Sequence, residues 1–199
     1  MASYGIDARR GGGVSVEGDS SMGTIVMGRP ALFILMYDVA REHRDLAKQV
    51  GGKDRLSEVK ESMISILFAY TCLEAYINTV GKDGLRKEWE KYETSSTEAK
   101  WFGVSKRLAT MKYGKSRSVF NKAKEPFKSF MELEKIREDT LVHWKADFDI
   151  QVPTKYGNTE VIVNTLNCDK AEWACNVVRD MVNQLTANID NPAPARWVE

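Results

Sequence analysis

The apolar residues along most of the chain recur every three to four positions, which predicts α-helices rather than strands. Such stripes run through 31–50, 56–80, 98–112, 127–143 and 170–189. Gly51 and Gly81 follow the first two stripes and predict where those helices end, while Pro126 precedes the fourth. Asp169 predicts the cap of the last helix. Two shorter helices are predicted over 85–92, with Trp89 inward, and over 116–124.

Two other segments alternate between apolar and polar residues, which is typical of β-hairpins. One pairs 147–152 with 159–164 around a Gly-Asn turn, and a weaker one lies within 1–28. The whole pattern predicts a mainly all-α fold, an up-and-down bundle of four main helices with one or two short helices and a small β-hairpin. We expect a flexible leader over 1–28, one helical domain over 29–190 and a tail over 191–199.

Composition fits one globular domain of 199 residues with a formal net charge of +1, which excludes a globally basic nucleic-acid protein. The three cysteines show no C-x-x-C spacing, so neither a disulfide framework nor a zinc ribbon is expected. No secretory signal is visible, and the apolar stretch over 64–77 is too short and too polar to span a bilayer. The expected location is the cytoplasm, without a membrane partner.

Familiar catalytic signatures are absent from the sequence: it has no P-loop, no dinucleotide fingerprint, no zinc-protease helix and no nucleophile elbow. His43 and His143 are its two histidines, which excludes a multi-histidine metal site. We therefore expect no metal and no other cofactor. His43 lies on the polar side of the first predicted helix, where a solvated surface histidine is expected.

The 127–143 helix ends in a candidate pair, because His143 follows Arg137 with five residues between them. This spacing places two helical side chains about 120° apart, so a long arginine or a loosened last turn must bring them together. Glu74 and Asn78 lie one turn apart on the second predicted helix, beside its apolar stripe. A half-buried carboxylate needs a cation, and Arg137 is the expected partner of Glu74. The alternatives are a purely structural ion pair and a histidine favoured by the helix C-terminus.

Basic residues gather between 100 and 128, where nine lysines and arginines stand against one acid, Glu125. Aromatic residues are interleaved with them, a combination that suits binding to RNA phosphates and bases. The candidate RNA-binding residues are Lys106, Arg107, Lys112, Lys115 and Arg117. A solvated basic face is the alternative.

Three strings of residues together resemble the HEPN superfamily. They are F-A-Y-T-C-L-E-A-Y-I-N on one helix, E-L-E-K-I-R-E-D-T-L-V-H-W-K on a later one and K-A-E-W-A on the last. The resemblance implies an α-helical bundle that forms homodimers. It also implies a metal-independent ribonuclease of the kind found in toxin–antitoxin and phage-defence systems, with RNA as substrate and an antitoxin or another protein as partner.

In this resemblance Arg137 and His143 match the arginine–histidine motif of the superfamily. The arginine is expected to hold the scissile phosphate, and the histidine to transfer a proton. Glu74 and Asn78 match the polar face that supports the arginine in many members.

Glu138 follows the arginine where the superfamily usually has a polar residue such as Asn, Asp or His, most often Asn, while Asp139 is a second candidate for that polar role. This departure favours an alternative, a non-catalytic HEPN module that binds RNA, a nucleotide or a protein. A structural helical interaction domain is the third interpretation.

Overall fold

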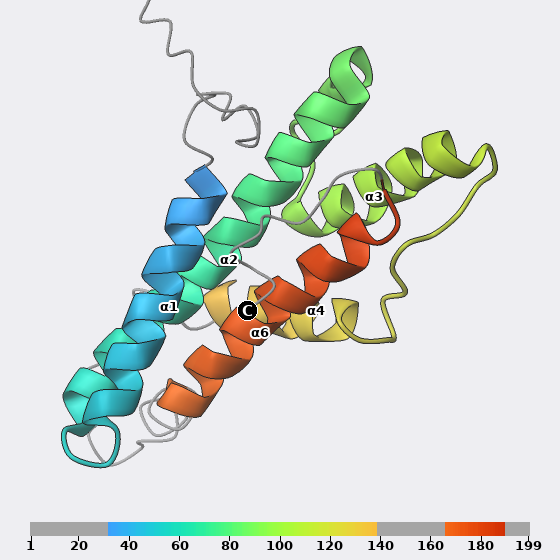
Figure 1. Cartoon of the computed structure of the whole chain (residues 1–199). Helices are drawn as coiled ribbons and strands as arrows, with labels where there is room; N and C mark the ends of the chain where they lie inside the picture. The colour runs from blue at the N-terminus through green and yellow to red at the C-terminus, as the bar shows by residue number, and fades with distance from the viewer. Residues whose placement is uncertain (1–31, 139–165, 190–199) are drawn as a thin grey trace, which may run out of the picture.

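The computed structural model describes residues 32–138 and 166–189, and every regular element within them is helical. The elements, in chain order, are α1 (Leu32–Val50), α2 (Arg55–Leu85), the 3₁₀ helix η1 (Arg86–Lys91), α3 (Thr97–Tyr113), α4 (Phe127–Ile136) and α6 (Cys168–Thr186) (Figure 1). The predicted all-α class is thus confirmed for the described residues. The predicted leader, the tail and both β-hairpins lie outside them.

α1 and α2 lie side by side as an antiparallel pair joined by a short turn (Figure 1). α1 ends at Val50 as predicted, and Gly52 takes the left-handed φ of +74° that favours glycine in such a turn. Asp54 then caps α2, because its carboxylate accepts a hydrogen bond from the backbone N–H of Ser57 at 3.2 Å. The turn glycine Gly52 and the capping residue Asp54 therefore set the end of α1 and the start of α2.

α2 continues through Gly81 to Leu85, so the predicted end at Gly81 is wrong. Gly81 does not end the helix but lets the Trp89 ring lie close to the backbone of α2. A Cβ at Gly81 would lie 2.4 Å from Cζ3 of Trp89 and 3.3 Å from Cγ1 of Val104. Trp89, on η1, is buried against this bare backbone, as its predicted inward position requires.

Replacing Gly81 with alanine is expected to destabilise the protein by about 1–3 kcal/mol, because the new methyl group would overlap the Trp89 ring. Gly84→Ala is the matched control on the same helix. Its Cβ would meet the flexible Leu108 side chain at 2.6 Å, which can turn away. Both variants gain the same helix propensity, so urea denaturation should show Gly81→Ala as the less stable one. The opposite order would contradict this packing.

By length and composition, the continuous helical segment Arg55–Lys91 could cross a membrane. It is the one such segment within 32–138 and 166–189, and 50% of its apolar window is buried inside the structure. The core helix of a soluble protein passes the same test. The expectation that the apolar stretch over 64–77 is too short for a bilayer does not hold by length, because it belongs to a longer helical segment that passes the test.

The core between α2, α3 and α4 is aromatic. Trp101 is fully buried, with ring centroids 5.7 Å from Phe120, 6.1 Å from Tyr76 and 6.2 Å from Phe130. These contacts join α2, α3, α4 and the segment before α4. They also fix the angle at which α3 and α4 leave α2.

The segment between α3 and α4 contains no helix, so the short helix predicted over 116–124 is wrong. Gly114 ends α3 with a left-handed φ of 68°. Val119 and Phe120 are buried, and the Gln184 side-chain amide donates to the Val119 carbonyl at 2.7 Å. The conformation of this segment is therefore set by the burial of Val119 and Phe120 and by the bond to α6, and not by local helix propensity.

α6 begins two residues earlier than the predicted cap allows. Asn167, rather than Asp169, is its N-cap, and the Asn167 side chain accepts from the Lys170 backbone N–H at 2.8 Å. Glu58 of α2 is buried and accepts from the Cys168 backbone N–H at 3.1 Å. A carboxylate at a helix N-terminus offsets its partial positive charge, so α2 helps to set the start of α6.

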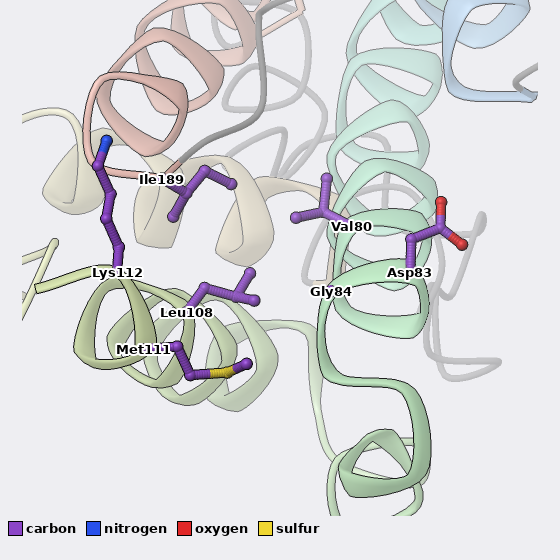
Figure 2. Close-up of a pocket in the computed structure, with 7 residues that line it drawn as sticks. All are labelled: Val80, Asp83, Gly84, Leu108, Met111, Lys112 and Ile189. Atoms are coloured by element: carbon purple, nitrogen blue, oxygen red, sulfur yellow. The ribbon is translucent and has the colours of Figure 1, made fainter. Parts of the chain in front are cut away.

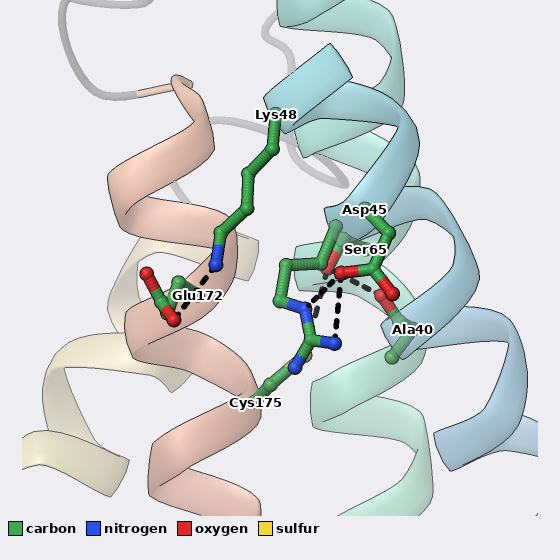
Figure 3. A network of polar contacts seen from close by, with 7 residues as sticks. Ala40, Asp45, Lys48, Ser65, Glu172 and Cys175 are labelled. Atoms are coloured by element: carbon green, nitrogen blue, oxygen red, sulfur yellow. Dashed lines mark hydrogen bonds and ion pairs between the residues drawn. The ribbon is translucent and has the colours of Figure 1, made fainter.

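α6 also packs against both α1 and α2, as Figure 3 shows. The Ser65 hydroxyl donates to the Ala40 carbonyl at 2.8 Å and lies 3.8 Å from Sγ of Cys175. At the rim, Lys48 of α1 pairs with Glu172 of α6 at 2.8 Å. Ser65 is buried, and its bond to the backbone satisfies a polar group that would otherwise destabilise this three-helix junction.

Candidate functional site

The helix that carries the candidate arginine changes geometry at that residue. α4 is α-helical to Ile136, and the next two residues, Arg137 and Glu138, are π-helical. Such wider turns recur at functional sites, and a loosened turn is what the spacing of Arg137 and His143 requires. Asp139, His143 and the rest of the predicted 127–143 helix lie outside the described residues.

The guanidinium of Arg137 lies over the ring of Tyr70, with its central carbon 4.9 Å from the ring centroid. Tyr70 is buried, so its ring is a fixed support, and such a cation–π contact contributes about 0.5–2 kcal/mol. The Arg137 side chain remains 29% exposed and lies 3.8 Å, N to O, from the Glu138 carboxylate. That separation exceeds hydrogen-bond length. Within the described part of the chain the five guanidinium N–H groups donate to no acceptor, so they can bind an anion.

Tyr70 also connects the arginine to a carboxylate of α4. Its hydroxyl donates to Oε1 of Glu134 at 3.0 Å. Burial raises the pKa of Tyr70 well above its ordinary value, so the phenol stays a proton donor in this bond. Burial also raises the pKa of Glu134, and the nearby carboxylates of Glu138 and Glu98 raise it further against the opposing effect of the Tyr70 bond and Arg137. A carboxyl group with elevated pKa therefore lies beside the candidate arginine.

This elevated pKa predicts a pH dependence of stability. The folded protein binds a proton at Glu134 more tightly than the unfolded chain does. The group's contribution to stability is therefore fully present below the ordinary pKa and is lost as pH rises through the folded pKa. Glu134→Gln keeps an acceptor for the Tyr70 hydroxyl and removes the titration. We expect this variant to melt above the wild type near neutral pH.

Thermal denaturation across pH checks this expectation. The melting temperatures of wild type and Glu134→Gln should converge near pH 4.5, the ordinary value for a glutamate. Glu132→Gln, on the exposed side of the same helix, is the matched control and should not reproduce the pattern. A wild type that gains stability over Glu134→Gln as the pH rises would contradict the elevated pKa.

Glu74 is not paired with Arg137, so the expected ion pair between them is wrong for the described residues. The Glu74 carboxylate instead accepts a hydrogen bond from the Thr97 hydroxyl at 3.2 Å. Thr97 begins α3 and is buried, directly after the helix cap Ser96. This contact fastens α3 to α2, and the Tyr70 ring takes the supporting position beside Arg137 that the sequence assigned to Glu74.

Asn78 lies one turn beyond Glu74 on the same face of α2. It lines a recess of about 260 Å³ between α2, η1 and α3. Its Oδ1 atom is buried and has no hydrogen-bond partner. Asn78 thus faces this recess and makes no hydrogen bond to Arg137.

The structure divides the candidate RNA-binding residues into separate groups. Arg107 is engaged by Glu88 of η1 through two hydrogen bonds of 2.7 and 2.8 Å. Such a bidentate pair uses most of the guanidinium, so Arg107 offers less to a phosphate than the sequence indicated. Lys106 and Lys115 are exposed on α3 and just after it.

Lys112 and Arg117 converge on one exposed aromatic ring. The Arg117 guanidinium carbon lies 4.5 Å and the Lys112 ammonium 5.2 Å from the centroid of Tyr113. This cluster stands at the far end of α3 from Thr97, roughly 24 Å along the helix axis. The structure therefore keeps the Tyr113 cluster apart from Arg137 within one copy of the chain.

His43 differs from its expected role as a solvated residue. Its Nδ1 lies 2.5 Å from Oε2 of Glu61, and the two side chains are only 24% and 13% exposed. The bond to His43 holds the pKa of Glu61 below its usual range. This contact joins α1 to α2 and contributes to packing.

A larger groove of about 500 Å³ opens between the end of α2, α3 and the residues after α6 (Figure 2). Its lining is mostly apolar, with Leu108, Met111 and Ile189 facing one another and Asp83 pointing away. Arg137, the candidate catalytic residue within the described part of the chain, does not line it. Among the described residues, no group of three or more His, Cys, Asp or Glu side chains is arranged to hold a metal ion.

Comparisons of the chain with known protein families, with curated proteins and with solved structures find no match.

The arrangement around Arg137 can bind and neutralise an anion. The Tyr70 ring supports one face of the guanidinium, and Glu134 and Glu138 limit the net positive charge around it. Sequence reasoning missed Tyr70 and Glu134. The available signal was their spacing: Tyr70 precedes Glu74 by one turn, and Glu134 precedes Arg137 by three residues, so each shares a helix face with a candidate.

Proposed function

We propose that this chain is a HEPN-type, metal-independent endoribonuclease in which Arg137 binds the scissile phosphate and His143 transfers protons. The observation that supports the proposal most is the guanidinium of Arg137, which is stacked on a buried ring and partly exposed. A planar guanidinium suits phosphate oxygens, and its fixed position reduces the entropy lost on binding.

In the proposed reaction His143 accepts the proton of a ribose 2′-hydroxyl. The 2′-oxygen then attacks the adjacent phosphorus, and the bond from phosphorus to the 5′-oxygen breaks. The 5′-oxygen takes up a proton, and the products are a 2′,3′-cyclic phosphate and a 5′-hydroxyl. Arg137 offsets the negative charge that grows on the phosphate oxygens. An imidazole with a pKa near ~6.5 suits proton transfer at neutral pH.

The same proposal includes a more detailed architecture, an oligomeric state and a biological setting. They are the up-and-down HEPN bundle, a homodimer whose two copies of the motif share one cleft, and a role in a toxin–antitoxin or phage-defence system. In such a dimer the second copy could present its own Tyr113 cluster to the same RNA.

A non-catalytic HEPN module is the second candidate, and the acidic surroundings of Arg137 favour it. Glu138 lies 3.8 Å from the guanidinium, and Glu134 lies on the same helix face. Two carboxylates near an arginine weaken its attraction for a phosphate. Such a site could bind RNA or a protein without cleaving it.

The test is a ribonuclease assay in the presence of a metal chelator, comparing wild type with Arg137→Ala and His143→Ala. We expect cleavage by the wild type and its loss in both variants. Absence of cleavage by the wild type, with retained RNA binding, would favour the non-catalytic module. Cleavage by His143→Ala at the wild-type rate would exclude the proposed mechanism.

A further inference from the structure

Within residues 32–138 and 166–189, one buried charge has no counterion. Lys100, on the first turns of α3, is only 7% exposed, yet its ammonium forms no ion pair or hydrogen bond with any described residue. The ring centroid of Trp89 lies 5.5 Å from the ammonium nitrogen. Burying an ammonium group without an opposite charge is unfavourable, and proteins retain such groups where a ligand supplies the charge.

Lys100 lines the same recess of about 260 Å³ as Asn78, and the other lining residues are Thr79, Lys82, Trp89 and Glu93. Lys82 supplies a second cation at the rim. Glu93 is an exposed carboxylate that does not reach the Lys100 ammonium. The recess therefore combines two cations, one rim carboxylate and a polar amide around an open space of about 260 Å³, which has room for a phosphate group.

Asn78 provides a second, independent sign of a missing ligand. Its Oδ1 has no hydrogen-bond partner although the atom is buried. A half-turn of the amide group exchanges its oxygen and its nitrogen. In that flipped orientation the Asn78 amide would present two N–H donors at the position of Oδ1. A ligand with acceptor oxygens would satisfy both this amide and the Lys100 ammonium.

We propose that this recess binds a phosphate monoester group, with Lys100 and Asn78 as its inner contacts and Lys82 at its mouth. A monoester is a dianion near neutral pH and matches two cations better than a diester monoanion does. The shared chemistry is found in two sources, a free nucleotide and the 5′-phosphorylated end of an RNA chain.

The recess stands on the same face of α2 as the Arg137 site, since Tyr70, Glu74 and Asn78 succeed one another at intervals of one turn. Tyr70 and Asn78 are therefore about 12 Å apart along the helix. One RNA chain could engage its 5′ end here and an internal phosphate at Arg137. The phosphate site itself does not depend on the proposed nuclease activity.

Calorimetric titration of the full chain tests the site with matched pairs of ligands. Adenosine 5′-monophosphate is compared with adenosine, and a 5′-phosphorylated RNA oligonucleotide with its 5′-hydroxyl form. We expect the phosphorylated member of each pair to bind more tightly. The tighter of the two phosphorylated ligands identifies the source. Equal affinity within both pairs, or no binding, would overturn the proposal.

Lys100→Met keeps the buried stem and removes the charge, and it should weaken binding of the phosphorylated ligand about tenfold or more. Lys87→Met, an exposed lysine of η1 outside the recess, is the control and should bind as the wild type does. Lys100→Met should melt at or above the wild-type temperature, because it removes an uncompensated charge. Unchanged affinity of Lys100→Met would overturn the proposal.

Asn78→Asp keeps the test decisive if Lys100→Met fails to fold. A carboxylate in the recess should repel the phosphate and abolish binding, whereas retained binding would overturn the site. Arg137→Ala should bind adenosine 5′-monophosphate normally. If the nuclease proposal fails, RNA is not cleaved but adenosine 5′-monophosphate still binds. If the phosphate site fails, adenosine 5′-monophosphate does not bind, whatever the cleavage assay shows.

Discussion

Arg137→Ala is expected to lower the rate of RNA cleavage by about 10²–10³-fold, the usual cost of removing one preorganised donor to a developing oxyanion. The guanidinium is held over the Tyr70 ring at 4.9 Å, so its orientation is set before RNA arrives. Alanine removes both the positive charge and the planar donor group. No other described arginine or lysine contacts this ring to take over the role.

The loss should appear in catalysis and not in folding. The Arg137 side chain is 29% exposed and its contact with Glu138 is long, so its removal should cost little beyond the cation–π contact, at most about 2 kcal/mol of unfolding free energy. Lys135→Ala, an exposed cation on the same helix, controls for the general loss of positive charge. Arg137→Lys should recover only part of the rate, because an ammonium cannot stack or donate bidentately as a guanidinium does.

Single-turnover cleavage of a labelled RNA under chelating conditions gives the rates, and circular dichroism confirms that the variants fold. An Arg137→Ala enzyme that cleaves as fast as the wild type would remove the arginine from the mechanism. Equal losses in Arg137→Ala and Lys135→Ala would show that only overall charge matters. Both results would be incompatible with the proposed role of the Tyr70 platform.

Trp101→Ala is expected to have the largest effect on stability, about 3–5 kcal/mol, which is a large share of the ~5–15 kcal/mol that keeps a typical domain folded. Trp101 is fully buried and contacts rings from α2, α4 and the segment before α4. Alanine would leave a cavity that three separate elements cannot all move to fill. Urea denaturation measures the difference in the free energy of unfolding.

Trp101→Phe is the matched comparison. The indole Nε1–H is buried without a hydrogen-bond partner, so the native tryptophan carries a penalty that phenylalanine removes. Phenylalanine keeps one aromatic ring in the cluster, and the expected loss is well below that of alanine. A Trp101→Ala protein within about 1 kcal/mol of the wild type would show that the aromatic cluster does not hold the helices together.

The predicted helices succeeded where local chemistry and the apolar period agree. α1 ends at the glycines that follow its stripe, and α3 extends the predicted 98–112 helix by one residue at each end. The predictions failed where a tertiary contact decided the outcome. Gly81 is read as a stop from sequence, yet α2 passes through it because the Trp89 ring needs a bare backbone there. The 116–124 segment has helix-compatible residues, yet Val119 and Phe120 are drawn into the core instead.

The candidate site shows the same division. Sequence marked Arg137, Glu74 and Asn78, and all three lie beside α2 or on its polar face. It could not assign their partners, since partners come from helices distant in the chain. Thr97 donates a hydrogen bond to Glu74, and the Tyr70 ring stacks on Arg137. Asn78 and Lys100 line one recess. Lys100 looked from sequence like one more member of a basic run.

The sequence by itself determined the helical class, most helix bounds and the position of the arginine at the end of α4, because these depend on periodicity and on neighbours within one turn. Only the tertiary structure decided which side chains meet. Three features follow from how α2, α3, α4 and η1 pack: Tyr70 stacks on the arginine, Arg107 is bound to Glu88, and Lys100 is buried without a counterion among the described residues. Burial and charge pairing act between elements, and no local pattern records them.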